Sequence, residues 1–277
     1  MTVIAAYAVP HPPLILPEVG RGQERKIQST IDGFQMVARR FKEDEPDTVV
    51  LISPHSVIYA DYFHISPGAR ASGDMSRFGV KGVKTTVEYD QEFAAGLEEA
   101  AAARGIPAGR AGERGRELDH GCVVPLRFFQ ESWDSFKLVR IGVSGLSAET
   151  HYLLGKLIAE VSAGLDRRVV VIASGDLSHR LKSDGPYGYA PEGPEFDKRV
   201  MACLGAGDFR ALIDIPEDLR EAAGECGWRP FVVMAGAFDG RRVEAERISY
   251  EGPFGVGYGI CAFKDAERSG ERNGIQR

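Results

Sequence analysis

The chain has 277 residues, of which 43% are hydrophobic and 27% are charged, and its formal net charge is −6. This composition is typical of a folded globular protein and excludes a disordered chain. The acidic balance argues against a nucleic-acid partner. No apolar run approaches the roughly 20 residues that cross a bilayer, which argues against a membrane protein.

The cysteines lie far apart and form no CxxC pair; they are Cys122, Cys203, Cys226 and Cys261. A chain of this length can build a core without disulfide bonds, so we expect free thiols and a cytoplasmic protein. The N-terminal segment is apolar, but it lacks a basic region and is interrupted by prolines. This pattern favours a strand and a loop over a signal peptide.

Short runs of valine, isoleucine and leucine alternate with longer runs whose apolar residues recur at helical spacing. The short runs predict strands buried on both faces, at residues 3–9, 48–52, 137–143 and 169–173. The longer runs predict helices at residues 22–42, 90–104, 147–164 and 193–205, with a further buried helix at 231–238. Strands that alternate with helices indicate an α/β sheet covered by helices on both faces.

Two segments depart from this alternation. Residues 57–89 are rich in tyrosine, phenylalanine, glycine and threonine, which predicts antiparallel strands or an active-site flap. Residues 243–250 and 255–263 are typical of a β-hairpin. The sequence shows no repeat and no flexible linker. We therefore expect one domain over residues 1–265, a three-layer α/β/α fold with a mixed, largely parallel central sheet and a C-terminal β-hairpin, and a polar tail at residues 266–277.

Three of the predicted strands are followed by a histidine: His11, His55 and His179. Ligands of open α/β sheets bind at the carboxyl ends of the strands. His11 and His55 stand in turns stiffened by proline, which suits a side chain that must stay fixed. Two imidazoles and one carboxylate hold Fe(II) in non-haem oxygenases, and the same ligands also suit catalytic zinc. We predict that His11 and His55 bind a metal.

The third ligand must come from another loop at the same edge of the sheet. Glu225 precedes the buried helix predicted at residues 231–238, and glycines on both sides permit close backbone approach. Cys226 is adjacent and could bind a metal as a thiolate. Glu225 is equally explained as an acidic residue at a helix N-terminus. The sequence leaves both residues open as the third ligand.

The run Ser-Gly-Asp-Leu-Ser-His places Asp176 and Ser178 beside His179. Histidine titrates near neutral pH and commonly transfers protons, so we predict an acid–base role for His179, with Asp176 to orient it. His120 follows Asp119 in a polar turn and could donate to a substrate or to a metal-bound species. Asp119 is equally explained as a helix cap.

In their order and spacing, these motifs resemble the LigB superfamily, the class III extradiol ring-cleavage dioxygenases (catalytic B subunit). The resemblance covers about residues 3–263. Its landmarks are Pro-His-Pro-Pro around His11, Ser-Pro-His-Ser around His55, Asp-His-Gly-Cys-Val-Val-Pro-Leu from Asp119, Ser-Gly-Asp-Leu-Ser-His up to His179, and Glu-Cys-Gly-Trp-Arg-Pro from Glu225.

This resemblance implies that His11, His55 and Glu225 hold Fe(II). It implies that His179 is the acid–base residue and that His120 is a second histidine near the substrate. The substrate would be a catechol-like or aminophenol ring, opened with O2. A homo-oligomer or a small partner subunit stays open.

The chain is also similar to Memo-like proteins, a branch of the same superfamily whose late motif carries a cysteine, and Cys226 matches that pattern. This similarity implies a metal-binding protein without ring-opening activity, in a redox or interaction role. Zn, Mn or Cu are then alternatives to Fe(II), and a zinc-dependent hydrolase on the same scaffold is a further alternative. We expect the substrate walls from residues 57–89 and from the loop that contains Tyr187.

Overall fold

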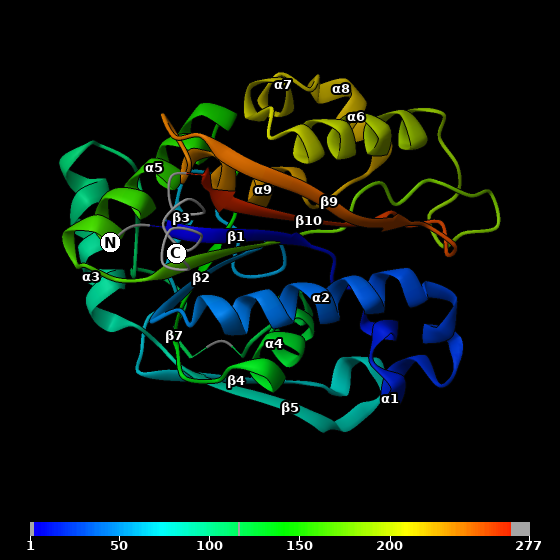
Figure 1. Cartoon of the computed structure of the whole chain (residues 1–277), viewed down its shortest axis with the longest axis horizontal. Coiled ribbons are helices and arrows are strands. Elements are labelled where there is room, and N and C mark those ends of the chain that lie inside the picture. Colours follow the sequence, from blue (N-terminus) through cyan, green and yellow to red (C-terminus); the bar gives the residue numbers. More distant parts are fainter. Residues whose placement is uncertain (1–2, 116, 267–277) are drawn as a thin grey trace, which may run out of the picture.

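In the computed structural model, which describes residues 3–115 and 117–266, the chain builds a central sheet of six strands (Figure 1). The strands are β1 (Val3–Val9), β2 (Thr48–Ser53), β7 (Lys137–Gly142), β8 (Val169–Ser174), β9 (Val243–Glu251) and β10 (Tyr258–Asp265). Their order across the sheet is β7-β2-β8-β1-β10-β9. The first four strands are parallel, and β10 is antiparallel to both β1 and β9. The mixed sheet and the C-terminal hairpin are confirmed.

Helices cover both faces of this sheet. They are α2 (Gln28–Asp44), α3 (Gln91–Ala103), α4 (His120–Ser132), α5 (Ala148–Gly164), α6 (Glu192–Ala206), α7 (Phe209–Ile213), α8 (Glu217–Ala223) and α9 (Trp228–Gly236). Short turns η1 (Pro13–Ile15), α1 (Pro17–Gly20) and η2 (Gln23–Ile27) precede α2. Helices α2 and α4 pack on one face, and α3, α5, α6 and α9 pack on the other (Figure 1). The three-layer α/β/α architecture predicted from the sequence is confirmed.

The four parallel strands are mostly apolar because both of their faces are buried. In β2, Val49 and Leu51 join the core beneath α2 and α4, whereas Val50 and Ile52 join the core beneath α5 and α9. Successive side chains of a strand point to opposite faces. A continuous apolar run is therefore what a two-sided core requires.

Side chains cap two of the predicted helices. The Asp90 carboxylate accepts a hydrogen bond from Phe93 N at 3.0 Å at the start of α3, and the Ser147 hydroxyl accepts one from Thr150 N at 3.2 Å at the start of α5. Each cap satisfies a backbone donor that has no partner within its helix. Both helices therefore begin within one residue of their predicted position.

Residues 57–89 contain antiparallel strands, as their composition suggested. Strand β4 (Arg70–Met75) pairs with β5 (Val80–Glu88), and the turn η3 (Ser76–Phe78) joins them. This hairpin packs against α4 (Figure 1). A separate pair of very short strands is formed by β3 (Phe63–His64) and β6 (Ala108–Gly109).

The turns that carry the singled-out histidines meet at one edge of the sheet. Strands β1 and β2 lie on either side of β8, and all three are parallel, so their carboxyl ends point the same way. This is the edge where open α/β sheets bind ligands. Of the polar tail expected at residues 266–277, all but the first residue lies outside the described residues. Among the helices of the described ranges, none has the length and apolar character to cross a membrane.

Candidate metal centre

A cleft of 800 Å³ opens at the carboxyl ends of β1, β2 and β8. Four of the six histidines of the chain line it, namely His11, His55, His120 and His179. They come from four separate loops or helix starts. The structure thus brings together the four histidines that the sequence singled out.

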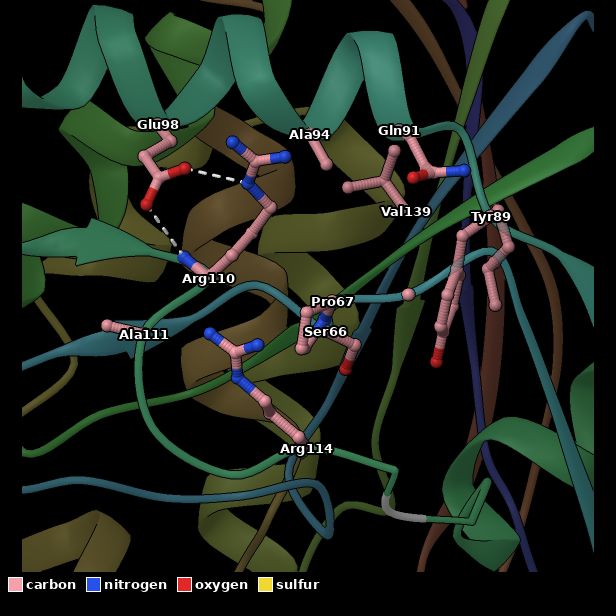
Figure 2. Close-up of a pocket in the computed structure, with 12 residues that line it drawn as sticks. Ser66, Pro67, Tyr89, Gln91, Ala94, Glu98, Arg110, Ala111, Arg114 and Val139 are labelled. Carbon is pink, nitrogen blue, oxygen red and sulfur yellow. Dashed lines mark hydrogen bonds and ion pairs between the residues drawn. The ribbon is translucent and has the colours of Figure 1, made fainter.

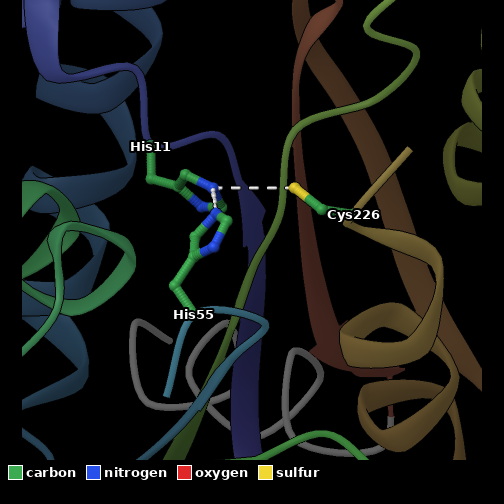
Figure 3. Close-up of side chains that lie close together, drawn as sticks. All are labelled: His11, His55 and Cys226. Atoms are coloured by element: carbon green, nitrogen blue, oxygen red, sulfur yellow. Dashed lines mark hydrogen bonds between the residues drawn. The ribbon is translucent and has the colours of Figure 1, made fainter. Parts of the chain in front are cut away.

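Two of these histidines and one cysteine form a compact group (Figure 3). Nε2 of His11 lies 3.0 Å from Nε2 of His55 and 3.6 Å from Sγ of Cys226. One ligand atom from each residue lies within 4.8 Å of the other two. Across residues 3–115 and 117–266, this is the one group of histidine, cysteine or carboxylate side chains with such spacing.

Hydrogen bonds at the end of β8 fix the orientation of His11. The Ser174 hydroxyl donates to the carbonyl oxygen of Gly121 at 2.6 Å, so it accepts from Nδ1–H of His11 at 2.9 Å. This assignment leaves Nε2 of His11 without a proton and with its lone pair toward the group. The amide of His11 also donates to Asp176 Oδ1 at 2.8 Å. A neutral imidazole held in this way is prepared to bind a metal.

Cys226 reaches the histidines because two backbone segments pack directly against each other. A Cβ atom on Gly175 would lie 2.1 Å from the Cα of Gly227, so only glycine permits this approach. The amide of Asp176 donates to Sγ of Cys226 at 3.3 Å, and the amide of Cys226 donates to the carbonyl oxygen of Asp176 at 3.4 Å. These contacts hold the sulfur beside the end of β8.

The adjacent Glu225 does not join the group, although the sequence put it forward as the metal carboxylate. Its Oε2 accepts a hydrogen bond from Trp228 N at 2.6 Å, at the start of α9. Neighbouring side chains of a turn leave the backbone in different directions, so the turn that directs Cys226 to the histidines directs Glu225 elsewhere. The compact group therefore contains Cys226 and not Glu225, which lies at the start of α9.

Burial keeps both histidines of the group neutral. It lowers the pKa of His11 well below its usual value, and repulsion from neighbouring histidines lowers it further. Burial also lowers the pKa of His55. In contrast, burial and nearby carboxyl groups raise the pKa of the Cys226 thiol well above its usual value. The imidazoles are therefore ready to bind a metal, whereas the thiol must release its proton as it binds.

His120 and His179 line the same cleft but lie outside the compact group. The ring of His120 stacks on that of His55 at 4.2 Å between centroids, and Phe78 packs against it at 5.2 Å. The ring of His179 stacks on Tyr187 at 5.1 Å. Burial lowers the pKa of both histidines to about 4, so both are neutral at pH 7. A neutral imidazole beside a cleft can accept a proton from a bound molecule.

Asp176 and Asp119 support the two paired histidines through the backbone. The Asp176 carboxyl group accepts from the amide of His11, and burial raises its pKa to about 7. Asp119 Oδ1 accepts from the Ser53 hydroxyl at 2.6 Å, and that hydroxyl accepts from the amide of His55 at 3.2 Å. Both carboxyl groups therefore fix the turns that carry the imidazoles.

Of the residues expected near His179, Tyr187 lies in the cleft and Ser178 does not. Ser178 is fully buried, and its hydroxyl donates to the carbonyl oxygen of Ala223 at 2.9 Å. Its amide donates to Asp197 Oδ1 at 2.7 Å. Ser178 therefore joins its loop to α6 and to the end of α8 instead of facing a substrate, because these bonds occupy its polar groups.

The sequence did not reveal the roles of Ser174 and Phe78. Ser174 begins the run that ends at His179, whereas its hydroxyl bonds to His11 of a distant segment. A serine at the end of a valine-rich strand was the available signal. Phe78 lies in the turn η3 and reaches the cleft only because the hairpin folds over α4, and no motif marks it.

The three donors suit a thiophilic metal. A tetrahedral ion with bonds of about 2.0 Å to nitrogen and about 2.3 Å to sulfur separates its ligand atoms by about 3.3–3.6 Å. Nε2 of His11 lies at comparable distances, 3.0 Å and 3.6 Å, from the other two donors. A thiolate with imidazoles suits Zn(II) or Cu(I), whereas Fe(II) oxygenases have a carboxylate in place of the sulfur. The residues therefore fit Zn(II) or Cu(I) better than Fe(II).

Comparisons with known proteins give matches over most of the chain. The family model of the catalytic LigB subunit of aromatic ring-opening dioxygenase matches residues 5–261. Protein CA_C1420 of Clostridium acetobutylicum is 36% identical over 94% of this chain. The match spans 57% of that protein, so the chain corresponds to little more than half of its length.

Two further relatives represent both branches named in the sequence resemblance. The 3,4-dihydroxyphenylacetate 2,3-dioxygenase of Escherichia coli is 26% identical over 84% of this chain and 88% of its own length. A MEMO1 family protein of Methanosarcina mazei is 29% identical over 45% of this chain and 43% of its own length.

Proposed function

We propose that this chain, which belongs to the LigB family of catalytic subunits of aromatic ring-opening dioxygenases, binds one metal ion, Zn(II) or Cu(I), through His11, His55 and Cys226. The observation that carries this proposal is the 3.6 Å contact between Sγ of Cys226 and Nε2 of His11. The chain would then be a thiolate-containing member of the family. Its similarity to a MEMO1 family protein supports the same view.

The residues on the two sides of the cleft would have different roles, metal binding on one side and proton transfer on the other. His11, His55 and Cys226 would hold the ion, which could supply Lewis-acid chemistry as zinc or electron transfer as copper. His120 and His179 would accept protons from a bound molecule, since both are neutral at pH 7. Aromatic side chains of the outer wall favour a flat, apolar ligand.

A pair of adjacent substitutions tests the donor set. We expect Cys226→Ser to weaken metal binding by more than about 100-fold, because loss of a ligand exceeds the roughly 10–100-fold effect of an outer partner. We expect Glu225→Gln to retain the metal, because glutamine keeps an oxygen acceptor for Trp228 N. Metal-free protein is titrated with Zn(II), and anaerobically with Cu(I), by competition with a chelator of known affinity.

Cobalt provides a direct readout of the sulfur. Co(II) bound to wild-type protein should show a sulfur-to-metal charge-transfer absorption band, and Cys226→Ser should abolish it while Glu225→Gln keeps it. Full binding by Cys226→Ser together with loss in Glu225→Gln would reverse the assignment. The ratio of the Zn(II) and Cu(I) affinities then identifies the preferred metal.

The second candidate function is Fe(II)-dependent opening of a catechol-like or aminophenol ring with O2. It is favoured by the position of His120 and His179 in the same cleft and by the similarity to 3,4-dihydroxyphenylacetate 2,3-dioxygenase. Lys26 and Lys182 also line the cleft and could attract an acidic side arm of such a substrate.

An oxygen electrode tests this candidate. The protein is loaded anaerobically with Fe(II) and then given O2 with 3,4-dihydroxyphenylacetate, protocatechuate, catechol or 2-aminophenol. Ring opening consumes O2 and forms a yellow product, and His179→Ala should slow it by about 10²–10⁴-fold. Absence of O2 consumption with all four compounds would reject ring opening for these substrates. Ester hydrolysis by the zinc-loaded protein would instead indicate a hydrolase.

A further inference from the structure

We propose that a second cavity, distant in the fold from the metal centre, binds a small molecule with an oxyanion group, a phosphate or a carboxylate (Figure 2). Its volume is 410 Å³, and it shares no lining residue with the histidine cleft. It lies beside strand β7, between α3 and the loops at residues 66–68 and 110–114.

Two arginines supply unused donors to this cavity. Nε of Arg110 donates to Glu98 Oε2 at 2.7 Å, which leaves its two terminal nitrogens without a partner among the described residues. The guanidinium of Arg114 likewise bonds to no described group. Figure 2 shows both side chains on the same side of the view, opposite Tyr89 and Gln91. Guanidinium groups with free donors recognise phosphate and carboxylate oxygens.

A tyrosine ring forms the wall opposite the arginines. Tyr89 lines the cavity with 6% of its surface exposed, and Figure 2 shows it across the view from both guanidinium groups. Its hydroxyl lies beside that of Ser66 and is buried, so it does not open into the cavity. The ring therefore suits a ligand with a flat apolar part.

The charge and the walls of the cavity define the class of ligand. Glu98 is the one acidic residue among those that line it, and both of its oxygens already accept from Arg110. The arginines therefore leave a positive balance. Glu113 lines a neighbouring cavity and does not face this one. Ala94, Val139 and Pro67 supply an apolar surface, which favours an oxyanion attached to a compact apolar or aromatic body.

Calorimetric titration of the full chain with three probes tests the proposal: phenyl phosphate, benzoate and inorganic phosphate. We expect an organic probe to bind more tightly than inorganic phosphate. The double variant Arg110→Gln, Arg114→Gln should weaken that binding by about tenfold or more, the effect of losing charged hydrogen bonds. The control is Arg104→Gln, since Arg104 pairs with Glu160 and lies outside the cavity; it should bind as the wild type does.

Tyr89→Phe is a second control, because it keeps the ring that lines the cavity and removes only a buried hydroxyl. It should bind the probes as the wild type does. Binding of only one organic probe would assign phosphate or carboxylate as the oxyanion. Failure of all three probes to bind, or equal binding by the double arginine variant and by Arg104→Gln, would overturn the proposal. Metal affinity should be the same in every variant.

Discussion

The two sides of the histidine cleft are built from different interactions. On the inner side, hydrogen bonds with Ser174 and with the carboxyl group of Asp176 fix His11, and a hydrogen bond from the amide of Asp176 fixes Cys226 at the end of β8. On the outer side, a hydrogen bond anchors the backbone of His179, whereas its ring is held by stacking on Tyr187, whose surface is 61% exposed. Directed hydrogen bonds in a buried site fix the position of an atom, whereas stacked rings can slide and tilt. We infer that the inner side is suited to an ion and the outer side to a variable ligand.

The largest expected difference between the two sides is in metal affinity after a histidine of either side is replaced by alanine. We expect His11→Ala and His55→Ala to weaken metal binding by more than about 100-fold, because each removes a proposed ligand. We expect His179→Ala to keep the full metal content, because its ring lies outside the compact group. Metal content after dialysis, measured by mass spectrometry, checks all three. Full occupancy in His11→Ala would refute the division of roles.

Ser174→Ala sharpens the comparison without removing a ligand. The variant deletes the group that accepts from Nδ1–H of His11, so the imidazole can turn and exchange its tautomer. Outer hydrogen-bond partners of metal ligands typically change affinity by about 10–100-fold, and we expect a loss in that range. Chelator competition measures it. The matched control is Ser162→Ala, since Ser162 is equally buried but its hydroxyl donates to the carbonyl oxygen of Arg167, away from the cleft; this variant should keep wild-type affinity.

The overall fold was predictable because it depends on periodicity. The runs at residues 49–52 and 169–173 are continuously apolar and short, which is typical of strands in a sheet buried on both faces. Helix α4 was less visible, since Pro125 lies inside it and proline usually marks a break. Helices α7 and α8 are too short for their apolar spacing to repeat. Regular elements were therefore more predictable than irregular ones.

The clustering of the histidines was predictable, whereas the sequence left the third residue of the group open between Glu225 and Cys226. His11 and His55 were visible because each follows a strand, and parallel neighbouring strands end at one edge. Glu225 and Cys226 are adjacent, and only the dihedral angles of their turn decide which side chain faces the edge. Those angles depend on the contact between Gly175 and Gly227, which joins segments distant in the chain. The spacing of residues along the sequence does not predict that contact.

The outer side should respond more weakly to substitution. Tyr187→Ala removes the ring that stacks on His179, and we expect binding of 4-nitrocatechol to metal-loaded protein to weaken by about threefold to tenfold, the contribution typical of an aromatic pair. The change in absorption of 4-nitrocatechol measures it. Tyr187→Phe should restore binding, because it keeps the ring. Tyr189→Ala is the control, since Tyr189 is also exposed but does not line the cleft. Equal losses in Tyr187→Ala and Tyr189→Ala would show that stacking has no part.

The smallest expected effect concerns the loop that carries Ser178 and His179, which Asp197 anchors through a hydrogen bond. Burial raises the pKa of Asp197 to about 7, and Asp197 accepts from the amide of Ser178 and from the hydroxyl of Tyr250. Between pH 4 and 7 the folded protein keeps a proton on Asp197 that the unfolded chain has lost. Asp197 therefore makes the folded state progressively less stable as the pH rises through this range.

Asp197→Asn should remove this dependence. Relative to wild type, the variant should gain on the order of 2–4 kcal/mol in free energy of unfolding between pH 4 and pH 7. Urea unfolding at several pH values measures the gain, and metal affinity at pH 7 should be unaltered, because Asp197 holds the outer loop and not the inner donors. A parallel pH profile for variant and wild type would show that Asp197 is ionised in the folded protein throughout this range. The loop that carries Ser178 and His179 would then be anchored by a charged carboxylate, and directed hydrogen bonds would hold both sides of the cleft.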